Sequence, residues 1–438
     1  MTRAPWRRAD PATVGGTDEW ARAYLPDDRS FELRNDYGSG AAVLVVPSGI
    51  DPEPPEPVAI AGIADRPAPI GPVPAVEGYG VFTFPYGPIS MGVPEAGRFD
   101  VRTYGERVLS LTPVAGYKSR RIRERVVGRS VEDAALVIER MAGNFSAAHV
   151  AAFLGAAESA EGIAVPSTEA SVRALGQELQ RIYNHVHVLA RVAEAASQNV
   201  GLAQTHALAE EVLRLQGRAF GHRWLFGALL PHGPARRLDA DDRSRLDQDL
   251  RALSDEFERL WSLFLESRTF VDRIQSTCVL RREDAVRGGA VGPTLRASGV
   301  AWDDRLRVPM PPYHDLFVAL PHESAGDALA RVVVRAQEVR SSFLLIEQML
   351  ERWPATVATT EPPDGRVADH RALARVEAPS GDLVYDVATR DGKVAHVGFR
   401  SPSQANWPLF AAGMRDAVFT DFHFAFESFG LVFSETDG

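Results

Sequence analysis

Three long segments of this chain carry apolar side chains at intervals of three and four residues. That spacing places the side chains along one face of an α-helix. The segments cover residues 168–197, 240–265 and 325–352. Their apolar positions are Val172, Leu175, Leu179, Ile182, Val186 and Leu189, then Leu246, Leu250, Leu253, Phe257, Leu260 and Phe264, then Leu329, Val332, Ala336, Val339, Phe343, Ile346 and Leu350. Because each stripe must be buried, the pattern predicts a bundle of long helices. Ser167 or Thr168 is the expected N-cap of the first helix.

Strand signals flank the helical region. Residues 41–47 form a short apolar run, and residues 79–117 and 374–402 show alternating apolar side chains between turns, with "RDGK" as one turn. Residues 51–78 are dense in proline, which stiffens a chain and removes a backbone donor, so an extended linker is expected there. We therefore expect a short N-terminal segment (1–50), this linker, and one large domain (79–438).

Composition excludes several classes of protein. A net charge of -10 makes nucleic acid an unfavourable partner. Cys278 is the single cysteine, so this chain alone forms no internal disulfide, iron–sulfur cluster or cysteine-rich zinc site. No apolar run reaches ~18 residues, so no membrane span is expected. A phosphate-binding loop, a Gly-x-Ser-x-Gly elbow and a His-Glu-x-x-His metal motif are also missing from the sequence.

Charged residues at helical spacing are the remaining candidates. Arg181 and His185 share a helix face, whereas the two histidines of "HVH" (185–187) point to different faces and chelate poorly. The set Asp327, Arg331, Arg335 and Glu338 forms a strip along another helix. A structural pair and a solvated face are the simplest interpretations. The basic block at 117–129 is either a solvated helix face or a surface for docking or substrate.

Eight motifs, in order, resemble the superfamily of nickel–iron hydrogenase large subunits. The resemblance is greatest to the formate-hydrogenlyase (membrane-bound hydrogenase) large subunit and to the quinone-site D-type subunit of respiratory complex I. It covers about residues 79–438. The motifs are "GPISMGVPEAGRF" (87–99), "GQELQRIYNHV" (176–186), "FGHRWLFG" (220–227), "VGPTLRASGVAWDDR" (291–305), "GDALARVVVRAQEVRSS" (326–342), "VEAPSGDL" (376–383), "SPSQANWP" (401–408) and "SFGLVFSETD" (428–437).

The sequence departs from this superfamily at its metal ligands. Nickel–iron enzymes bind their metals through two Cys-x-x-Cys pairs, because thiolates are the soft ligands these metals require. The first pair aligns with Ala142 and Phe145, and the second with Val432 and Glu435. All four thiolates are absent. The comparison therefore predicts no metal site and the loss of hydrogen activation.

Two residues of the family's quinone pocket are replaced as well. Its headgroup tyrosine falls near Gly143, and its loop histidine falls at Ser90. A reduced quinone needs donors that deliver protons. Ser90, Tyr117, His149 or water would have to supply them.

The resemblance implies an α+β fold, with a central long-helix bundle, an N-terminal strand region and a small C-terminal β-sheet. It implies the large subunit of an NADH:quinone oxidoreductase-like or hydrogenase-like complex, with a quinone-type cleft beside a small iron–sulfur partner subunit. This chain would hold no cofactor by itself, and membrane antiporter-like subunits would attach it to the cytoplasmic face of the membrane. The alternative is a non-catalytic scaffold that couples an electron-transfer module to the membrane module. The residues expected to line a cleft or proton route are Glu95, Arg120, Arg181, His185, Asp327 and Arg331.

Overall fold

The computed structural model describes four short N-terminal strands by their backbone and the chain from residue 68 to 437. Residues 72, 74, 75, 91, 232, 235 and 355–369 lie outside this description. The N-terminal strands are β1 (Trp6–Arg8), β2 (Trp20–Tyr24), β3 (Ser30–Asp36) and β4 (Ala41–Pro47), paired in the order β1-β4-β3-β2. The predicted strand at 41–47 is confirmed. Most of the proposed linker lies outside the described residues.

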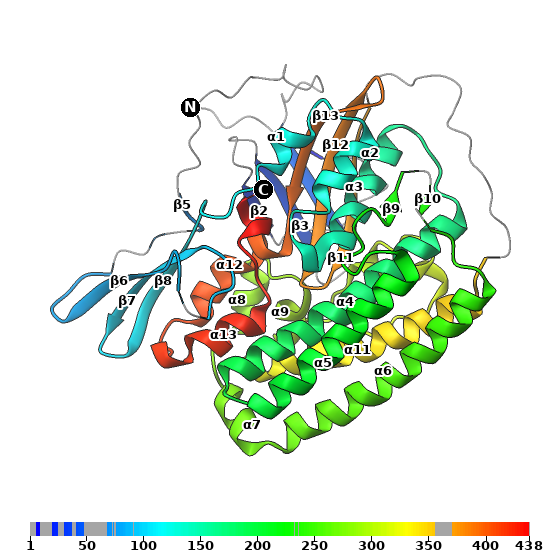
Figure 1. Ribbon diagram of the computed structural model, residues 1–438. Coiled ribbons are helices and arrows are strands. Elements are labelled where there is room, and N and C mark those ends of the chain that lie inside the picture. Colours follow the sequence, from blue (N-terminus) through cyan, green and yellow to red (C-terminus); the bar gives the residue numbers. More distant parts are fainter. Residues whose placement is uncertain are drawn as a thin grey trace.

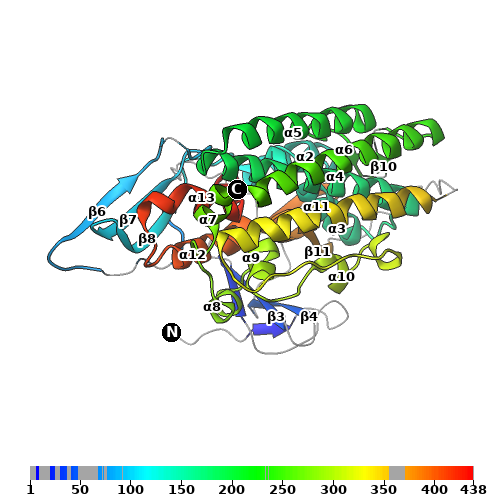
Figure 2. The same ribbon diagram turned by 90° about the horizontal axis from the view of Figure 1, so that it is seen from below.

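A bundle of long helices forms the centre of the molecule. It contains the three predicted helices and a fourth, α5 (Asn199–Phe220), for which no apolar stripe was identified. The three predicted helices are α4 (Ser167–Ala195), α6 (Ala240–Glu266) and α11 (Ala328–Glu351). Figures 1 and 2 show α5, α6 and α11 running side by side. The predicted stripes of α4 and α6 are buried. The predicted N-cap is wrong: Pro166 caps α4, no side chain accepts a cap hydrogen bond, and Ser167 already belongs to the first turn.

The bundle is not built from one-sided helices alone. The α6 helix has a single apolar stripe and a charged outer face, which suits an outer position. By contrast, α4 and α11 are buried on most sides, including several arginine, glutamate and histidine side chains, although Glu194 and Arg340 are exposed. They pack on each other and on α13 (Phe422–Phe429). The polar faces of these two helices therefore lie inside the protein.

A three-stranded antiparallel sheet packs beside the bundle. It consists of β11 (His370–Ala378), β12 (Gly381–Arg390) and β13 (Lys393–Arg400). The predicted "RDGK" turn joins β12 to β13, and Asp391 and Gly392 both have positive φ, as the favoured hairpin turn requires. Helix α3 (Ser146–Ala160) lies against β11 and β12 and is buried all round. The C-terminal sheet of the predicted α+β fold is thus confirmed.

A second sheet and a cluster of aromatic rings form the opposite end. Strands β6 (Val81–Tyr86), β7 (Arg98–Tyr104) and β8 (Arg107–Ala115) pair antiparallel, and β5 (Ala68–Pro69) adds to β8. Figure 1 shows this sheet projecting from the body. Phe99 of β7 packs among Trp407 and Phe410 of α12 (Pro402–Gly413) and Phe422 of α13. These rings fix the sheet to the C-terminal helices.

Short elements complete the fold. They are α1 (Ile122–Val126), α2 (Val131–Ile138), the 3-10 turn at Gly143–Phe145, β9 (Leu229–Leu230), β10 (Gly233–Pro234), α7 (Arg268–Ile274), α8 (Arg282–Arg287), α9 (Gly292–Ala297), α10 (Asp304–Arg307), the 3-10 turns at Tyr313–Asp315 and Phe419–Asp421, and α14 (Ser434–Asp437). In the basic block, α1 buries only Ile122 and Val126 and exposes Arg125. Among the helices that the structure describes, none is both long and apolar enough to cross a membrane.

Two glycines bring the β11–β12 hairpin against the start of α9. Gly292 has φ +62, and a Cβ atom there would lie 2.2 Å from the carbonyl oxygen of Ser380. Gly381 has φ +127, and its Cβ would lie 2.5 Å from the amide nitrogen of Gly292. Only glycine permits both the left-handed backbone and the close approach. Two of the family-like motifs therefore meet at this point.

We predict that Gly292→Ala destabilises the protein more than Gly162→Ala. Gly162 also has positive φ (+69), but a Cβ there would meet nothing within 4 Å. The control substitution therefore carries only the cost of the left-handed backbone, about 1–2 kcal/mol. Gly292→Ala adds the clash with a backbone oxygen, roughly 1–3 kcal/mol more. Equal losses in the free energy of unfolding, measured by chemical denaturation, would show that the contact between the two motifs is unimportant.

Candidate functional site

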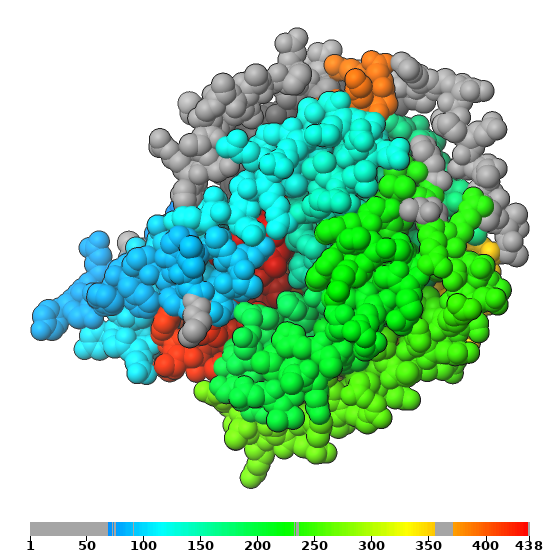
Figure 3. All heavy atoms as spheres, in the orientation of Figure 1, coloured from blue at the N-terminus to red at the C-terminus, as the bar shows by residue number. Residues whose placement is uncertain are grey.

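An open cleft of about 600 Å³ lies between the projecting sheet and the helix bundle. Its lining residues are Pro94, Glu95, Arg120, Arg140, Gly143, Asn144, Tyr183, His187, Trp224, Phe226 and Val432. In Figure 3 the hollow is visible between the cyan and green surfaces, with the red C-terminal segment at its floor. A volume of this size suits a small organic molecule.

Six separate segments build the cleft. The β6–β7 loop supplies Glu95, the β8–α1 loop supplies Arg120, and the segment after α2 supplies Gly143. One wall consists of Tyr183 and His187 of α4, together with Trp224 and Phe226 from the segment after α5. Val432 comes from the segment after α13. The site therefore depends on contacts between parts of the chain that are far apart in sequence.

Aromatic rings cover the bundle side of the cleft. Tyr183 and His187, one turn apart on α4, stack with their ring centroids 5.8 Å apart. Trp224 meets Tyr183 edge to face at 5.1 Å. The guanidinium of Arg140 lies 4.8 Å above the centroid of the Phe226 ring, a distance typical of a cation–π contact. This wall offers flat surfaces on which an aromatic ligand can stack.

Two arginines and one carboxylate give the cleft its charge. Arg120 donates to the carbonyl oxygens of Arg140 and Met141. Arg140 pairs with Glu139 below the surface. Glu95 accepts a hydrogen bond from the backbone N–H of Ser434 at 2.9 Å. Glu95, Arg120 and Gly143 thus lie together in this cleft.

The four positions where relatives with a nickel–iron site would carry thiolates lie at or near the cleft floor. Val432 lines the cleft, and Ala142 and Phe145 are buried beside Gly143. Glu435 is fully buried; its carboxylate lies 3.1 Å from Nε2 of His149 and accepts a hydrogen bond from Ser403. His149 Nδ1 lies 2.8 Å from the Tyr385 hydroxyl. His149 is therefore a core residue and does not line the cleft.

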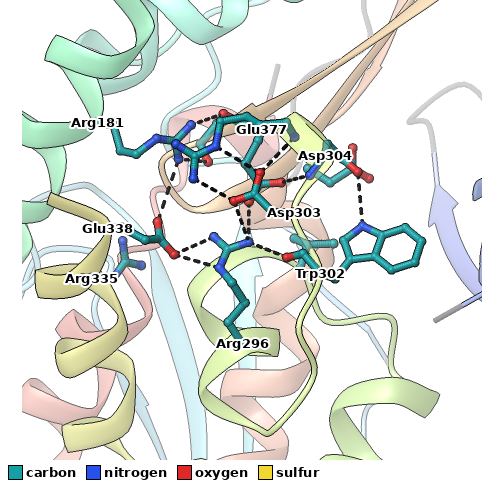
Figure 4. A network of polar contacts seen from close by, with 12 residues as sticks. Arg181, Arg296, Trp302, Asp303, Asp304, Arg335, Glu338 and Glu377 are labelled. Atoms are coloured by element: carbon teal, nitrogen blue, oxygen red, sulfur yellow. Dashed lines mark hydrogen bonds and ion pairs between the residues drawn. The ribbon is translucent and has the colours of Figure 1, made fainter. Parts of the chain in front are cut away.

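Next to the cleft lies a buried network of ions centred on Glu338 of α11 (Figure 4). Its carboxylate binds Arg296 of α9 at 2.7 Å and His185 of α4 at 2.9 Å. Burial alone would raise the pKa of the Glu338 carboxyl, but Arg296 and His185 hold this pKa well below its ordinary value. Burial lowers the pKa of His185 to about 3, so its imidazole is neutral near pH 7. Arg335 lies 3.1 Å from the other ring nitrogen of His185.

Arg181 extends the network to the sheet. It donates to the carbonyl oxygens of Glu377 and Ala378, at 2.5 and 3.1 Å, and pairs with Glu178 at 3.3 Å. Arg296 also binds the Glu377 carboxylate at 2.8 Å. Burial raises the pKa of Glu377 to about 7, with Arg296 acting in the opposite direction. A small cavity of about 70 Å³ borders this end of the network, lined in part by Glu377.

The charged strip of α11 is buried, so its interpretation as a solvated face is wrong. Asp327 caps the helix by accepting from Ala330 N at 2.8 Å, and it also accepts from Ser276 N at 2.6 Å. Arg331 donates to Ser428 Oγ and to the carbonyl of Cys278, and stacks over the Phe429 ring. Both side chains hold helices together. Neither Asp327 nor Arg331 lines the cleft, and the same is true of Arg181 and His185.

The remaining predicted residues also lie apart from the lining. Tyr117 accepts a hydrogen bond from Arg98 at 3.1 Å, and Ser90 lies in the β6–β7 loop. Periodicity overlooked four rings of the cleft wall: Tyr183, His187, Trp224 and Phe226. The first of these lies inside the motif at 176–186 and the second directly follows it, at positions where the family pattern specifies no residue. In the described part of the chain, no three His, Cys, Asp or Glu side chains are arranged to hold a metal ion.

Comparisons with known proteins agree with this architecture. Residues 203–367 match the family of the 49 Kd subunit of respiratory-chain NADH dehydrogenase. The carbon monoxide-induced hydrogenase of Rhodospirillum rubrum is 28% identical over 347 residues, 78% of this chain and 94% of that protein. A D-type subunit of the NADH-quinone oxidoreductase of a Roseiflexus species is 29% identical, over 78% of this chain and 94% of that protein.

A membrane-bound hydrogenase subunit alpha from Pyrococcus furiosus is 27% identical, over 81% of this chain and 86% of that protein. The chain is thus similar to hydrogenase large subunits and to complex I D-type subunits. A solved chain of the same fold comes from a membrane-bound sulfane sulfur reductase, described as an archaeal respiratory membrane complex. It superimposes with a TM-score of 0.76 at 23% identity, over 82% of this chain and 99% of that one. The Pyrococcus and Roseiflexus proteins are named as subunits, and the solved chain is part of a membrane complex.

We predict that Glu338→Gln destabilises the protein by roughly 3–5 kcal/mol, because it breaks a buried ion pair with Arg296 and leaves the buried cations with less negative charge. The matched control is Glu258→Gln, which removes the partner of Arg340 in a pair that is about 40% exposed. Little change is expected there, since exposed ion pairs contribute little. Similar effects of the two substitutions on the free energy of unfolding would contradict the assigned role of the network.

A pH-dependent contribution to stability is expected from Glu427. Burial raises the pKa of this carboxyl to about 7, although Arg191, 2.8 Å away, acts against the shift. The folded protein therefore retains a proton that the unfolded chain releases above pH ~4.5. The stabilisation is complete below that pH and is lost as pH rises to about 7.

Wild type should consequently lose stability relative to Glu427→Gln by up to about 1.4 kcal/mol per pH unit across this window. Denaturation curves at several pH values measure this difference. Glu194→Gln, which removes the half-exposed partner of the same arginine, is the control and should follow wild type. Parallel curves for wild type and Glu427→Gln would contradict the raised pKa.

Proposed function

We propose that this chain is the large subunit of a membrane-associated oxidoreductase complex and that its cleft binds a quinone headgroup. The observation that carries the proposal is the cleft itself, with aromatic rings on one wall and the guanidinium of Arg120 on another. A planar ring stacks on the aromatic wall, and positive charge stabilises the oxygens of a quinone as they gain electrons.

The electrons and protons must come from outside this chain. A quinone becomes a quinol by taking up two electrons and two protons, so that each C=O group becomes C–O–H. An iron–sulfur cluster in a small partner subunit would supply the electrons, and water would supply the protons. The open side of the cleft gives such a partner access to the bound ring.

The proposal includes the loss of the nickel–iron site. Ala142, Phe145 and Val432 cannot ligate a metal, and the Glu435 carboxylate is engaged by His149 and Ser403. Nickel and low-potential iron require thiolates, and the single cysteine lies elsewhere, buried at position 278. Elemental analysis of the purified complex should accordingly detect no nickel bound to this subunit.

The relatives support the assignment to a membrane complex. Two of them are named as a membrane-bound hydrogenase subunit and a formate hydrogenlyase subunit, and the structural neighbour is part of a respiratory membrane complex. We propose that antiporter-like subunits hold this chain at the cytoplasmic face of the membrane, opposite the iron–sulfur subunit. Affinity purification from membranes should recover both kinds of partner.

One observation favours the alternative of a non-catalytic scaffold. Ser90 and Gly143 replace the family's headgroup donors, and both Glu95 and Arg120 are already engaged by backbone groups. In that case the buried network would transmit conformational change between modules without chemistry in the cleft. The two functions make different demands on the cleft. A quinone site needs space in the cleft for the headgroup, whereas a scaffold does not.

Gly143→Leu separates the two functions. A Cβ atom at Gly143 would meet only the rings of Trp224 and Phe226, at 3.7 and 4.0 Å, which is ordinary van der Waals contact. A leucine side chain should therefore enter the cleft without moving the backbone. We expect quinone photolabelling of the cleft peptides and quinone-dependent turnover of the complex to fall at least tenfold. Co-purification of the partner subunits should be unchanged.

Gly143→Ala, which adds only the Cβ atom, is the graded control and should remain close to wild type. If Gly143→Leu leaves turnover unchanged in an intact complex, the cleft is not the quinone site and the scaffold role is favoured. Photolabel confined to another subunit in the wild-type complex would have the same meaning.

A further inference from the structure

The cleft contains two ring donors on one helix that no motif assigned. Tyr183 and His187 lie at positions i and i+4 of α4, so they project from the same face, and both line the cleft. The Tyr183 side chain is held in place by the edge of Trp224 and by the stacked His187 ring. Their orientation is therefore set before any ligand binds.

Unlike the charged side chains of the cleft, these two side chains have no hydrogen-bond partner within the described part of the protein. Glu95 and Arg120 are engaged by backbone groups, and Arg140 is engaged by Glu139. Among the described residues, neither the Tyr183 hydroxyl nor the His187 ring nitrogens have a hydrogen-bond partner. A ligand in the cleft can therefore take their hydrogen bonds without breaking existing ones.

Their surroundings keep both groups uncharged near neutral pH. Burial raises the pKa of Tyr183 to about 12. Burial, together with Arg191 and the neighbouring His206 of α5, lowers the pKa of His187 to about 4. The cleft wall thus presents one O–H and one N–H donor, and neither has the strong hydration of an ion. Such donors suit the carbonyl oxygens of a neutral ring.

We propose that Tyr183 and His187 are the headgroup donors of this chain and hydrogen-bond a quinone carbonyl in the cleft. The inference rests on the proposed function, because it needs a quinone in this cleft. It assigns to α4 the role that the loop position Ser90 and the position Gly143 no longer fill. Arg120 lies on a different segment of the lining. Within the residues that the structure describes, only its Nη1 donates to backbone oxygens, so its other nitrogen atoms can meet the opposite edge of the ring.

The test compares the affinities of two probes for the purified complex. One probe is a short-chain 1,4-naphthoquinone, and the other is the naphthalene that carries the same side chain but no carbonyl groups. Both stack on the aromatic wall, but only the quinone accepts hydrogen bonds. The ratio of their dissociation constants therefore reports on donors, whereas a general disturbance of the cleft changes both constants together.

Tyr183→Phe and His187→Phe keep the rings and remove the donors. Each should lower the preference for the quinone by about two- to tenfold, the range of a single neutral hydrogen bond, and the double variant should lower it further. His187→Gln restores an N–H donor and should recover part of the preference. Tyr117→Phe and His314→Phe are the matched controls, since neither residue lines the cleft, and both should match wild type.

The outcomes separate this inference from the proposed function. If the naphthoquinone binds in the cleft and Gly143→Leu blocks it, but all variants retain the wild-type preference, the donor assignment is wrong and the quinone site stands. If the wild-type cleft does not discriminate between the two probes and Gly143→Leu has no effect, the quinone site itself is wrong. Thermal melting of each variant, together with the His187→Gln result, excludes loss of folding as the cause.

Discussion

A single buried carboxylate, that of Glu338, connects three helices from separate parts of the sequence. It binds an arginine from α9 and a histidine from α4, and it lies on α11. Removing charges from water is costly unless each finds an opposite charge and hydrogen bonds at good geometry. The three elements must therefore take one relative arrangement. The ions contribute less as a source of net stability than as a requirement for this specific packing.

The cleft depends on that arrangement, although it contains none of these ions. Tyr183 lies two residues after Arg181 and two before His185 on α4, so the same helix presents its charged side chains to the core and its rings to the cleft. Any rotation of α4 that displaced the rings would also break the contacts to Glu338 and to the carbonyl oxygens of the β11–β12 hairpin. The buried ions thus set the position of the cleft wall.

Three of the four long helices could be predicted from the sequence, whereas most of the site could not, for a physical reason. The stripe of α6 follows from burial against one neighbour, and periodicity detects it. Helix α3 consists largely of alanine and other small residues and is buried on all sides. It therefore has no one-sided apolar stripe that periodicity could detect. The α11 charges suggested a solvated face, because spacing cannot show that α9 supplies the counter-charge of Glu338 and that α4 supplies a histidine partner for Glu338 and Arg335.

The residues of the cleft fall into two groups, those that the family pattern locates and those that only the folded structure brings together. Glu95, Arg120 and Gly143 could be located by their place in the family pattern, and they do meet in the cleft. Tyr183 and His187 occupy variable positions in and directly after a motif, and Trp224 and Phe226 belong to a loop, so only the folded chain shows that their rings form one wall. The specified positions of the motif contribute to the packing of the fold. The residues between or beside them supply the rings that are particular to the cleft of this chain.

Other contacts join the chain in the region where nickel–iron relatives would hold their metals. A thiolate site ties separate segments together through metal bonds. Here the segment of α3 and the C-terminal segment are joined instead by His149 and Glu435, with Tyr385 and Ser403 completing their hydrogen bonds. This buried arrangement uses the oxygen atoms of a carboxylate at a position that aligns with a thiolate. These hydrogen bonds therefore hold α3 against the C-terminal segment that also supplies Val432 to the cleft lining.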